Sequence, residues 1–375
     1  MIWTRYLLCF ILGYVVFVAA AYQASSEEYQ YVKRLPEYDP QYYPSSLWEL
    51  DNAVRLKKWA SQLRFGKRSG NSWASQIYSH EKWFFSMEDY ETWLKAFGPE
   101  DFNLIVAIDT KLNKVIGSVA VAKYPGADGS ESLVALGLYF VHPDHRKKGL
   151  GNELFRMAFK DSHFVGINRG LVAVESMVAK YCNAYGYDKI SSGKAVTARA
   201  LVSDLQLTNL FIDEKIQVLS LQEASRLIDF ENLVHFDMEN NGGLNRGKYL
   251  NAWLAAPNSI SSQIAFDENG EIVGYINIRT SIGNDIGVSP LIAKSPEIAS
   301  TLLRRGLEEV HDLEQYRQIF FFSLTDNHTA RKIYVKLTVG TLIPVATCTP
   351  MYTEKLLPTK SENVFSVTEY TMCTI

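Results

Sequence analysis

The chain has few cysteines, and they do not suit a disulfide framework. Only four occur among 375 residues. Cys9 lies in an apolar N-terminal run, which leaves Cys182, Cys348 and Cys373, an odd number. This count excludes the small disulfide-stapled class of secreted domain.

A strong charge of one sign is also lacking. The formal net charge is −3, and the nearest approach to a basic tract, Arg64–Arg68, is more typical of a solvated loop than of a binding patch. We therefore expect no nucleic-acid partner. We predict no metal site either. A hydrophobic content of 47% over this length predicts real cores, divided between two domains.

One long apolar run is present, at the N-terminus. Arg5 is followed by an uncharged stretch, Tyr6–Ser26, which contains the small residues Ala19–Ala21. This pattern predicts that residues 1–21 are a secretory signal peptide, with a secreted or lumenal protein as the result. The stretch also approaches the ~20 residues that span a bilayer, so a single-pass signal-anchor is the alternative, and the only membrane contact we expect. A buried first helix is a third interpretation.

Alternating patterns after this run predict a mixed fold of strands and helices. Residues 22–45 are polar, with several Tyr and Pro residues, and read as a linker. The expected elements that follow are helices at Leu47–Leu63 and Met87–Phe97, a hairpin at Asn103–Tyr124, strands at Ser132–Val141 and Asn168–Val174, and a helix at Met177–Tyr185.

The most informative segment is Val141–Phe155, which reads VHPDHRKKGLGNELF. It joins a buried strand to an amphipathic helix through a basic cluster and the pair Gly149 and Gly151. Glycine lets the backbone turn sharply and approach a ligand, and the free amides at the start of a helix favour an anion. The segment therefore predicts a phosphate cradle. The alternative is an ordinary strand-to-helix turn with solvated lysines.

The spacing Arg146-x-x-Gly149-x-Gly151 after a strand resembles the pyrophosphate motif of the GNAT acetyltransferase superfamily. The resemblance implies that acetyl-CoA is the substrate held here, gripped between the fourth strand and the third helix. The residues that it assigns to the coenzyme are Val141, Arg146, Lys147, Lys148, Gly149, Leu150, Gly151 and Asn152.

Catalytic residues are less clear in the first half. In the family, a tyrosine four residues before a glycine-aromatic pair acts as the acid for the leaving thiolate. The pair here is Gly186-Tyr187, so Cys182 holds the position of that tyrosine, and Tyr181 is one residue away. Tyr181 is the candidate acid, or else a core aromatic. The family's strand glutamate is replaced by Ala135. His142 is then a candidate base, or a strand-end histidine, and Glu175 could orient substrate or cap the next helix.

The second half repeats the order of the first and indicates an internal duplication. Asn327-x-x-Ala330-x-x-Ile333-Tyr334 matches the family's fourth-helix signature, although Thr338 replaces the glycine. The loop that should hold pyrophosphate, Pro290–Pro296, has no Gly-x-Gly, and its Ser295 reads as a helix cap. Asn327 also begins a glycosylation sequon, which we expect to be unused at a strand-to-helix junction.

The resemblance thus implies a mixed α/β (α+β) fold of two tandem GNAT-like domains, at residues 46–204 and 205–375. Each would be a mixed, mostly antiparallel sheet flanked by helices, as in YitH/HolE-type tandem GNAT proteins with a diverged second domain. The expected activity is N-acetyl transfer from acetyl-CoA to a small-molecule or peptide amine. The alternative is a catalytically impaired GNAT-fold binding protein of the secretory pathway, a location where acetyl-CoA would have to be delivered.

Overall fold

The structure is a computed structural model of the chain. The expected linker and the expected helix at Leu47–Leu63 fall outside the residues that it describes, as does all of the expected signal segment except residues 15–19. The described residues are 15–19, 73–109, 114–126, 132–160 and 162–372.

The chain forms two compact units that interleave along the sequence. Each unit is assembled from three separate stretches of the chain. The first unit takes its described residues from Met1–Trp83, Gly98–Ala122 and Leu138–Val165, and the second from Phe84–Phe97, Lys123–Gly137 and Gly166–Ile375.

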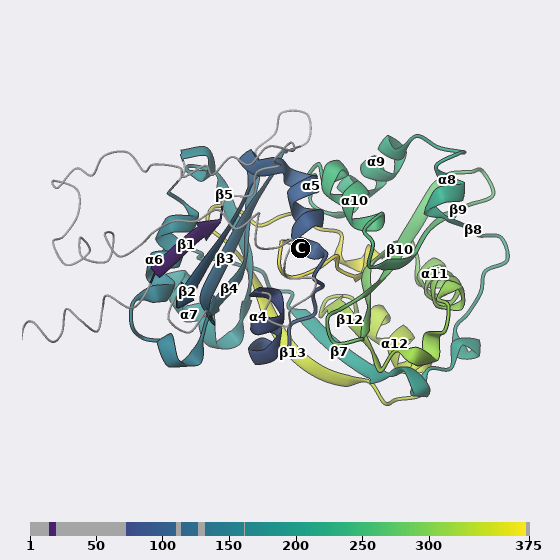
Figure 1. Cartoon of the computed structure of the whole chain (residues 1–375). Helices are drawn as coiled ribbons and strands as arrows, with labels where there is room; N and C mark the ends of the chain where they lie inside the picture. Colours follow the sequence, from purple (N-terminus) through teal and green to yellow (C-terminus); the bar gives the residue numbers. More distant parts are fainter. Residues whose placement is uncertain (1–14, 20–72, 110–113, 127–131, 161, 373–375) are drawn as a thin grey trace, which may run out of the picture. The chain divides into compact units, whose positions relative to one another are not determined.

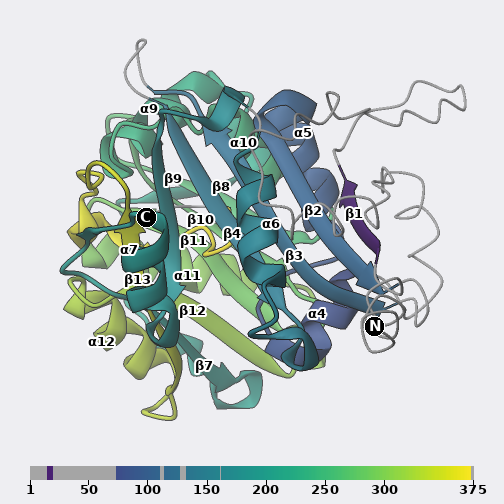
Figure 2. The same cartoon turned by 90° about the vertical axis from the view of Figure 1, so that its left-hand side faces the viewer.

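The first unit is built on antiparallel strands. Strand β2 pairs with β3 from Phe102↔Ala122 to Asp109↔Lys114, which confirms the expected hairpin. Helix α6 packs closely on β3, since a Cβ on Gly117 would lie 2.7 Å from Leu154 Cδ1. Figure 2 shows α6 against these strands. The elements that contribute to this unit are β1 Val15–Ala19, α4 Trp73–Glu81, β2 Phe102–Asp109, β3 Lys114–Tyr124, the end of β4 Leu133–Val141, and α6 Leu150–Ala158.

The second unit contains a long mixed sheet. Its strands follow the order β4-β5-β13-β7-β12-β11-β10-β9-β8, while β6 pairs with β13 and β14 pairs with β11. The expected strand at Asn168–Val174 is confirmed as β5. The other strand bounds are β6 Lys189–Ile190, β7 Ala195–Leu201, β8 Gln217–Ser220, β9 Ser259–Phe266, β10 Ile272–Thr280, β11 Ile286–Ala293, β12 Gln318–Leu324, β13 Ile343–Tyr352 and β14 Val364–Ser366.

Helices cover both faces of the strands β9–β12. Alternate residues of one strand point to opposite faces, so Ile276 joins one buried cluster and Tyr275 joins another. The first cluster contains α11 and α12, and the second contains α8, α9 and α10 (Figure 1). The helices of this unit are α5 Asp89–Asp101, whose last turn belongs to the first unit, α7 Val178–Tyr185, α8 Leu221–Ala224, α9 Phe230–Asn240, α10 Gly247–Leu254, α11 Pro296–Glu309 and α12 His328–Leu337.

Two strands are exchanged between the halves of the sequence. Strand β7 follows α7 in the first half but pairs with β12 of the second, from Leu201↔Gln318 to Ala195↔Leu324. Strand β13 follows α12 but pairs with β5, from Cys348↔Val174 to Tyr352↔Gly170. The halves therefore cannot separate without breaking both of these ladders.

The described helices are short. None of those within the described residues is long and apolar enough to cross a membrane.

Candidate functional site

The expected coenzyme loop lies between β4 and α6, as the sequence predicts. Gly149 is the residue before α6, in the left-handed conformation (φ 89°, ψ −19°), which suits glycine. No side chain of the described residues caps the helix there. Apart from Gly149 itself and its two chain neighbours, no described residue has an atom within 4 Å of the position that a Cβ on Gly149 would take. This nine-residue helix therefore starts without a side-chain cap, next to the open space beside Gly149, and the start of a helix favours an anion.

Gly151 is a glycine for a different reason. A Cβ at this position would lie 2.5 Å from the Tyr139 hydroxyl and 3.3 Å from Val141 Cγ2. The first turn of α6 thus lies directly against the end of β4. This close packing fixes where the helix amides point.

The three basic residues of the loop differ in their roles. Arg146 donates through Nε to the Val141 carbonyl at 2.9 Å, and its Nη2 lies 2.8 Å from Glu81 Oε1 on α4. It therefore fastens the loop to its surroundings. Lys147 and Lys148 are exposed at the surface, where their charges can meet phosphates of a ligand.

Strand β4 departs from regular pairing before it reaches the loop. Its parallel ladder with β5 runs from Leu133↔Asn168 only as far as Ala135↔Gly170. Leu138 then takes a positive φ of 48°, and its carbonyl accepts a hydrogen bond of 2.6 Å from the Ser118 hydroxyl. This irregularity lies in the strand that, by the family resemblance, grips acetyl-CoA together with the following helix.

His142 follows β4 directly and lies in a cluster of imidazole rings. Its ring centroid is 4.5 Å from that of His80 on α4 and 5.8 Å from that of His145. Partial burial, followed by the neighbouring His80, lowers the pKa of His142. The imidazole is therefore neutral at neutral pH, with Nδ1 accepting a 3.3 Å hydrogen bond from the Asp144 amide. This is the protonation state that a base requires.

Tyr181 and Cys182 lie on α7, in the second unit. The Tyr181 side chain is buried, and its ring lies 6.0 Å from that of Tyr187 and 6.1 Å from that of Tyr185. The cluster is compatible with the core-aromatic interpretation as well as with a role as acid. Cys182 is partly exposed.

Glu175 is an exposed residue at the end of β5. Its Oε2 lies 3.0 Å from Lys194 Nζ, a surface ion pair. Neither the short turn at Glu175 nor α7 shows a side-chain cap.

The second half has the expected cap at Ser295 and a second cap at Asn327. Ser295 accepts from the Ile298 amide to begin α11, with Pro296 in its first turn, and Asn327 accepts from the Ala330 amide at 2.9 Å to begin α12. Asn327 is 4% exposed and its amide nitrogen already donates to main-chain carbonyls, so the sequon is not accessible in the folded chain.

One buried acid was missed by sequence reasoning. Glu369 accepts hydrogen bonds from Trp93 Nε1 at 2.9 Å and from the Tyr249 hydroxyl at 2.6 Å, both at Oε1. Burial, together with the nearby Asp89 carboxylate, raises the pKa of Glu369 to about 7. No local motif marks Glu369, because its partners lie far from it in the sequence. Within the described ranges, no group of His, Cys, Asp and Glu is arranged to hold a metal ion.

Comparison with known proteins finds the same superfamily in both halves. Residues 70–182 match the model described as the acetyltransferase (GNAT) family, and residues 234–366 match one described as an acetyltransferase (GNAT) domain. The chain is a tandem member of the GNAT superfamily. A search of curated proteins finds no match.

Solved structures share this fold. A putative acetyltransferase from Pyrococcus horikoshii has a TM-score of 0.53 and 15% identity, over 76% of this chain and 85% of that one. A tandem GNAT protein from the clavulanic acid biosynthesis pathway has a TM-score of 0.50 and 13% identity, over 72% of this chain and 87% of its own. At these identities the likeness concerns the fold alone.

Proposed function

We propose that this tandem GNAT protein is an N-acetyltransferase that binds acetyl-CoA at the loop Val141–Asn152 of its first half. The observation that carries the proposal is the uncapped start of α6 behind Gly149, with Lys147 and Lys148 exposed beside it. Helix amides, the helix dipole and two ammonium groups together suit a diphosphate. The remaining coenzyme contacts are assigned to Val141, Arg146, Leu150, Gly151 and Asn152.

The proposed reaction moves the acetyl group from sulfur to nitrogen. A neutral amine attacks the thioester carbonyl, the C–S bond breaks, and the thiolate leaves and takes up a proton. A base removes the proton that the amine nitrogen carries. His142 is the proposed base, Tyr181 the proposed acid for the thiolate, and Glu175 a group that orients the amine. The acceptor is a small-molecule or peptide amine.

A second candidate function is coenzyme binding without transfer. It is favoured by Ala135, which stands where many GNAT enzymes carry a glutamate and is fully buried in β4. The burial of Tyr181 also favours it.

Calorimetric titration of the full chain with acetyl-CoA tests the binding step. Gly151→Glu should abolish binding, because it adds bulk against Tyr139 and a negative charge beside the phosphates. Leu227→Glu, which adds the same charge at an exposed position of the second half, is the matched control and should bind normally. No binding by the native chain would overturn the proposal.

Thiol release separates the two candidates. Release of free coenzyme A with any member of a panel of amines and peptides supports the enzyme. Binding without release across the panel supports the binding protein.

We also propose a secretory location, either secreted, lumenal or anchored by one membrane span. It is supported only by the basic start, the apolar run and the small residues within Arg5–Ser26. Expression with a C-terminal tag followed by N-terminal sequencing tests it. A new N-terminus near Ala21 supports cleavage, and a cytosolic chain that begins at Met1 contradicts the proposal.

A further inference from the structure

The C-terminal segment of the chain enters the sheet of the second half. Strands β11 and β12 are parallel partners from Ile286↔Ile319 to Val288↔Phe321. Beyond this ladder β11 changes partner and pairs antiparallel with β14, at Leu291↔Ser366 and Ile292↔Val364. Strand β14 therefore pairs with the part of β11 that lies beyond its ladder with β12.

Ser366 connects the two strands that diverge. Its hydroxyl donates to the Val288 carbonyl of β11 at 2.6 Å and accepts from the Phe322 amide of β12 at 3.1 Å. One residue later, the Val367 amide donates to the Phe322 carbonyl at 2.8 Å. The segment thus supplies main-chain and hydroxyl partners to both strands.

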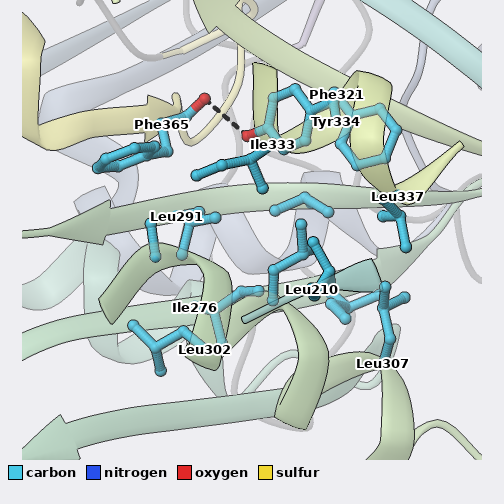
Figure 3. Close-up of a cluster of buried hydrophobic side chains, with 14 of the residues drawn as sticks. Leu210, Ile276, Leu291, Leu302, Leu307, Phe321, Ile333, Tyr334, Leu337 and Phe365 are labelled. Carbon is cyan, nitrogen blue, oxygen red and sulfur yellow. Dashed lines mark hydrogen bonds between the residues drawn. The ribbon is translucent and has the colours of Figure 1, made fainter. Parts of the chain in front are cut away.

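The same segment contacts Asn327 and Tyr334, two residues of the fourth-helix signature of the second half. Asn327 Nδ2 donates to the carbonyls of Ser361, Glu362 and Val364 at 3.2, 3.0 and 3.0 Å. The Tyr334 hydroxyl, fully buried, donates to the Phe365 carbonyl at 2.7 Å (Figure 3). These two side chains recognise backbone carbonyls and thereby the extended form of a peptide.

The segment stays buried beyond β14. Arg246 Nη1 donates to the Thr368 hydroxyl at 3.2 Å, and Glu369 accepts from Trp93 and Tyr249. The Tyr124 hydroxyl donates to the Met372 carbonyl at 2.7 Å. Val364, Phe365, Ser366, Val367, Thr368 and Met372 are each at most 3% exposed.

We propose that the second half holds an internal peptide-binding groove, formed by β11, β12 and α12, and that residues Ser361–Met372 are its resident ligand. We call these residues the C-terminal strap. The groove binds the main chain of an extended peptide. Because the strap fills the groove, a second acyl-coenzyme A molecule cannot reach Asn327 and Tyr334. The expected number of acetyl-CoA molecules bound per chain rests on the proposed function. The proposal that the strap fills the groove does not rest on it.

A split protein tests the groove directly. The chain is truncated after Lys360 and mixed with a synthetic peptide Ser361–Met372, and binding is followed by calorimetry. We expect one peptide per truncated chain and none for the full chain, whose groove is already filled. Asn327→Ala and Tyr334→Phe in the truncated chain should each weaken the peptide at least about five-fold, the effect of one lost hydrogen bond of ~1 kcal/mol.

Peptide variants give the matched controls. Ser366→Ala in the peptide removes both of its hydroxyl bonds and should weaken binding. Glu362→Gln changes an exposed side chain and should leave binding unchanged. Failure of the peptide to bind a folded truncated chain, or equal binding by the full chain, would overturn the proposal.

If the truncated chain does not fold, hydrogen exchange on the full chain decides the question. The strap amides should exchange as slowly as those of β11, and Asn327→Ala or Tyr334→Phe should speed exchange within residues 361–372. Asn168→Ala is the control, since Asn168 is a buried asparagine that donates to the Lys355 carbonyl at 2.9 Å outside the strap. Fast exchange of the strap in the native chain contradicts the groove, whether or not acetyl-CoA binds. If the strap is protected from exchange but acetyl-CoA does not bind, only the proposed function is contradicted.

Discussion

Tyr334 on α12 donates its hydroxyl to the main-chain carbonyl of Phe365 over 2.7 Å. The sequence places Tyr334 where GNAT proteins carry their helix tyrosine. In this half the hydroxyl is instead engaged by the chain itself, and complete burial raises the pKa of Tyr334 far above its ordinary value. The tyrosine stays protonated and acts as a donor to peptide backbone.

Tyr334→Phe should therefore affect stability and leave coenzyme binding unchanged. The variant loses one buried hydrogen bond and leaves the Phe365 carbonyl without this donor, a cost of about 1–2 kcal/mol. Urea unfolding measures the first effect, and acetyl-CoA titration the second. A loss of coenzyme affinity without a loss of stability would place Tyr334 in a coenzyme site and contradict the account.

Glu81→Gln should strengthen acetyl-CoA binding. Glu81 places a carboxylate 2.8 Å from Arg146 Nη2, so its removal leaves the guanidinium charge beside the loop uncompensated. We expect a gain of a few-fold in affinity at low salt that shrinks as salt screens the charges. Glu268→Gln, at the exposed β9–β10 turn, gives the same change in net charge and should have no effect. Weaker binding by Glu81→Gln would show that the ion pair is needed to hold the loop in its binding form.

The two loop glycines should respond differently to alanine. Gly149→Ala meets no atom but forces a side chain into the left-handed region (φ 89°), which costs about 1 kcal/mol. Gly151→Ala has no such strain, and its methyl group instead meets the Tyr139 hydroxyl. Adding Tyr139→Phe should restore stability to Gly151→Ala and not to Gly149→Ala. Thermal or urea unfolding of the four variants checks this; equal effects of Tyr139→Phe in both backgrounds would contradict it.

Glu369→Gln should flatten the dependence of stability on pH. The pKa of Glu369 is raised from 4.5 to about 7 by burial and Asp89, against the opposing effects of Tyr249, Trp93 and Arg279. Between pH 4.5 and 7 the folded chain therefore binds this proton more tightly than the unfolded chain, and the stability that Glu369 contributes falls as pH rises through this window.

Glutamine keeps an acceptor for Trp93 and Tyr249 and carries no charge at any pH. Above pH 7 the variant should be more stable than the native chain, by up to about 3 kcal/mol. Urea unfolding across the pH window measures the difference. A variant with the same slope as the native chain would show that Glu369 does not titrate in this range, and Glu268→Gln controls for a change in net charge.

Much of the first half could be predicted because its signals are local. An apolar run, a proline, a basic cluster and two glycines follow one another within Leu133–Ala158, so the strand, the turn and α6 could each be read from neighbouring residues. The caps of Ser295 and Asn327 are local in the same way. Their hydrogen bonds reach only three residues along the chain.

What the sequence did not predict depends on contacts between distant residues. The pairing of Ser366 with Leu291 and of Ala195 with Leu324 joins segments that carry no shared pattern. Strand β7 of the first half pairs with β12 of the second, and β13 of the second half pairs with β5 of the first. Glu369 accepts a hydrogen bond from Trp93, 276 positions away in the sequence. Such partners could not be found from local periodicity.

The number of acetyl-CoA molecules bound by each full-length chain tests the account most directly. Calorimetry should give one site per chain, lost in Gly151→Glu and unaffected by Tyr334→Phe. No site would contradict the coenzyme loop of the first half. Two sites would contradict the strap that fills the groove of the second.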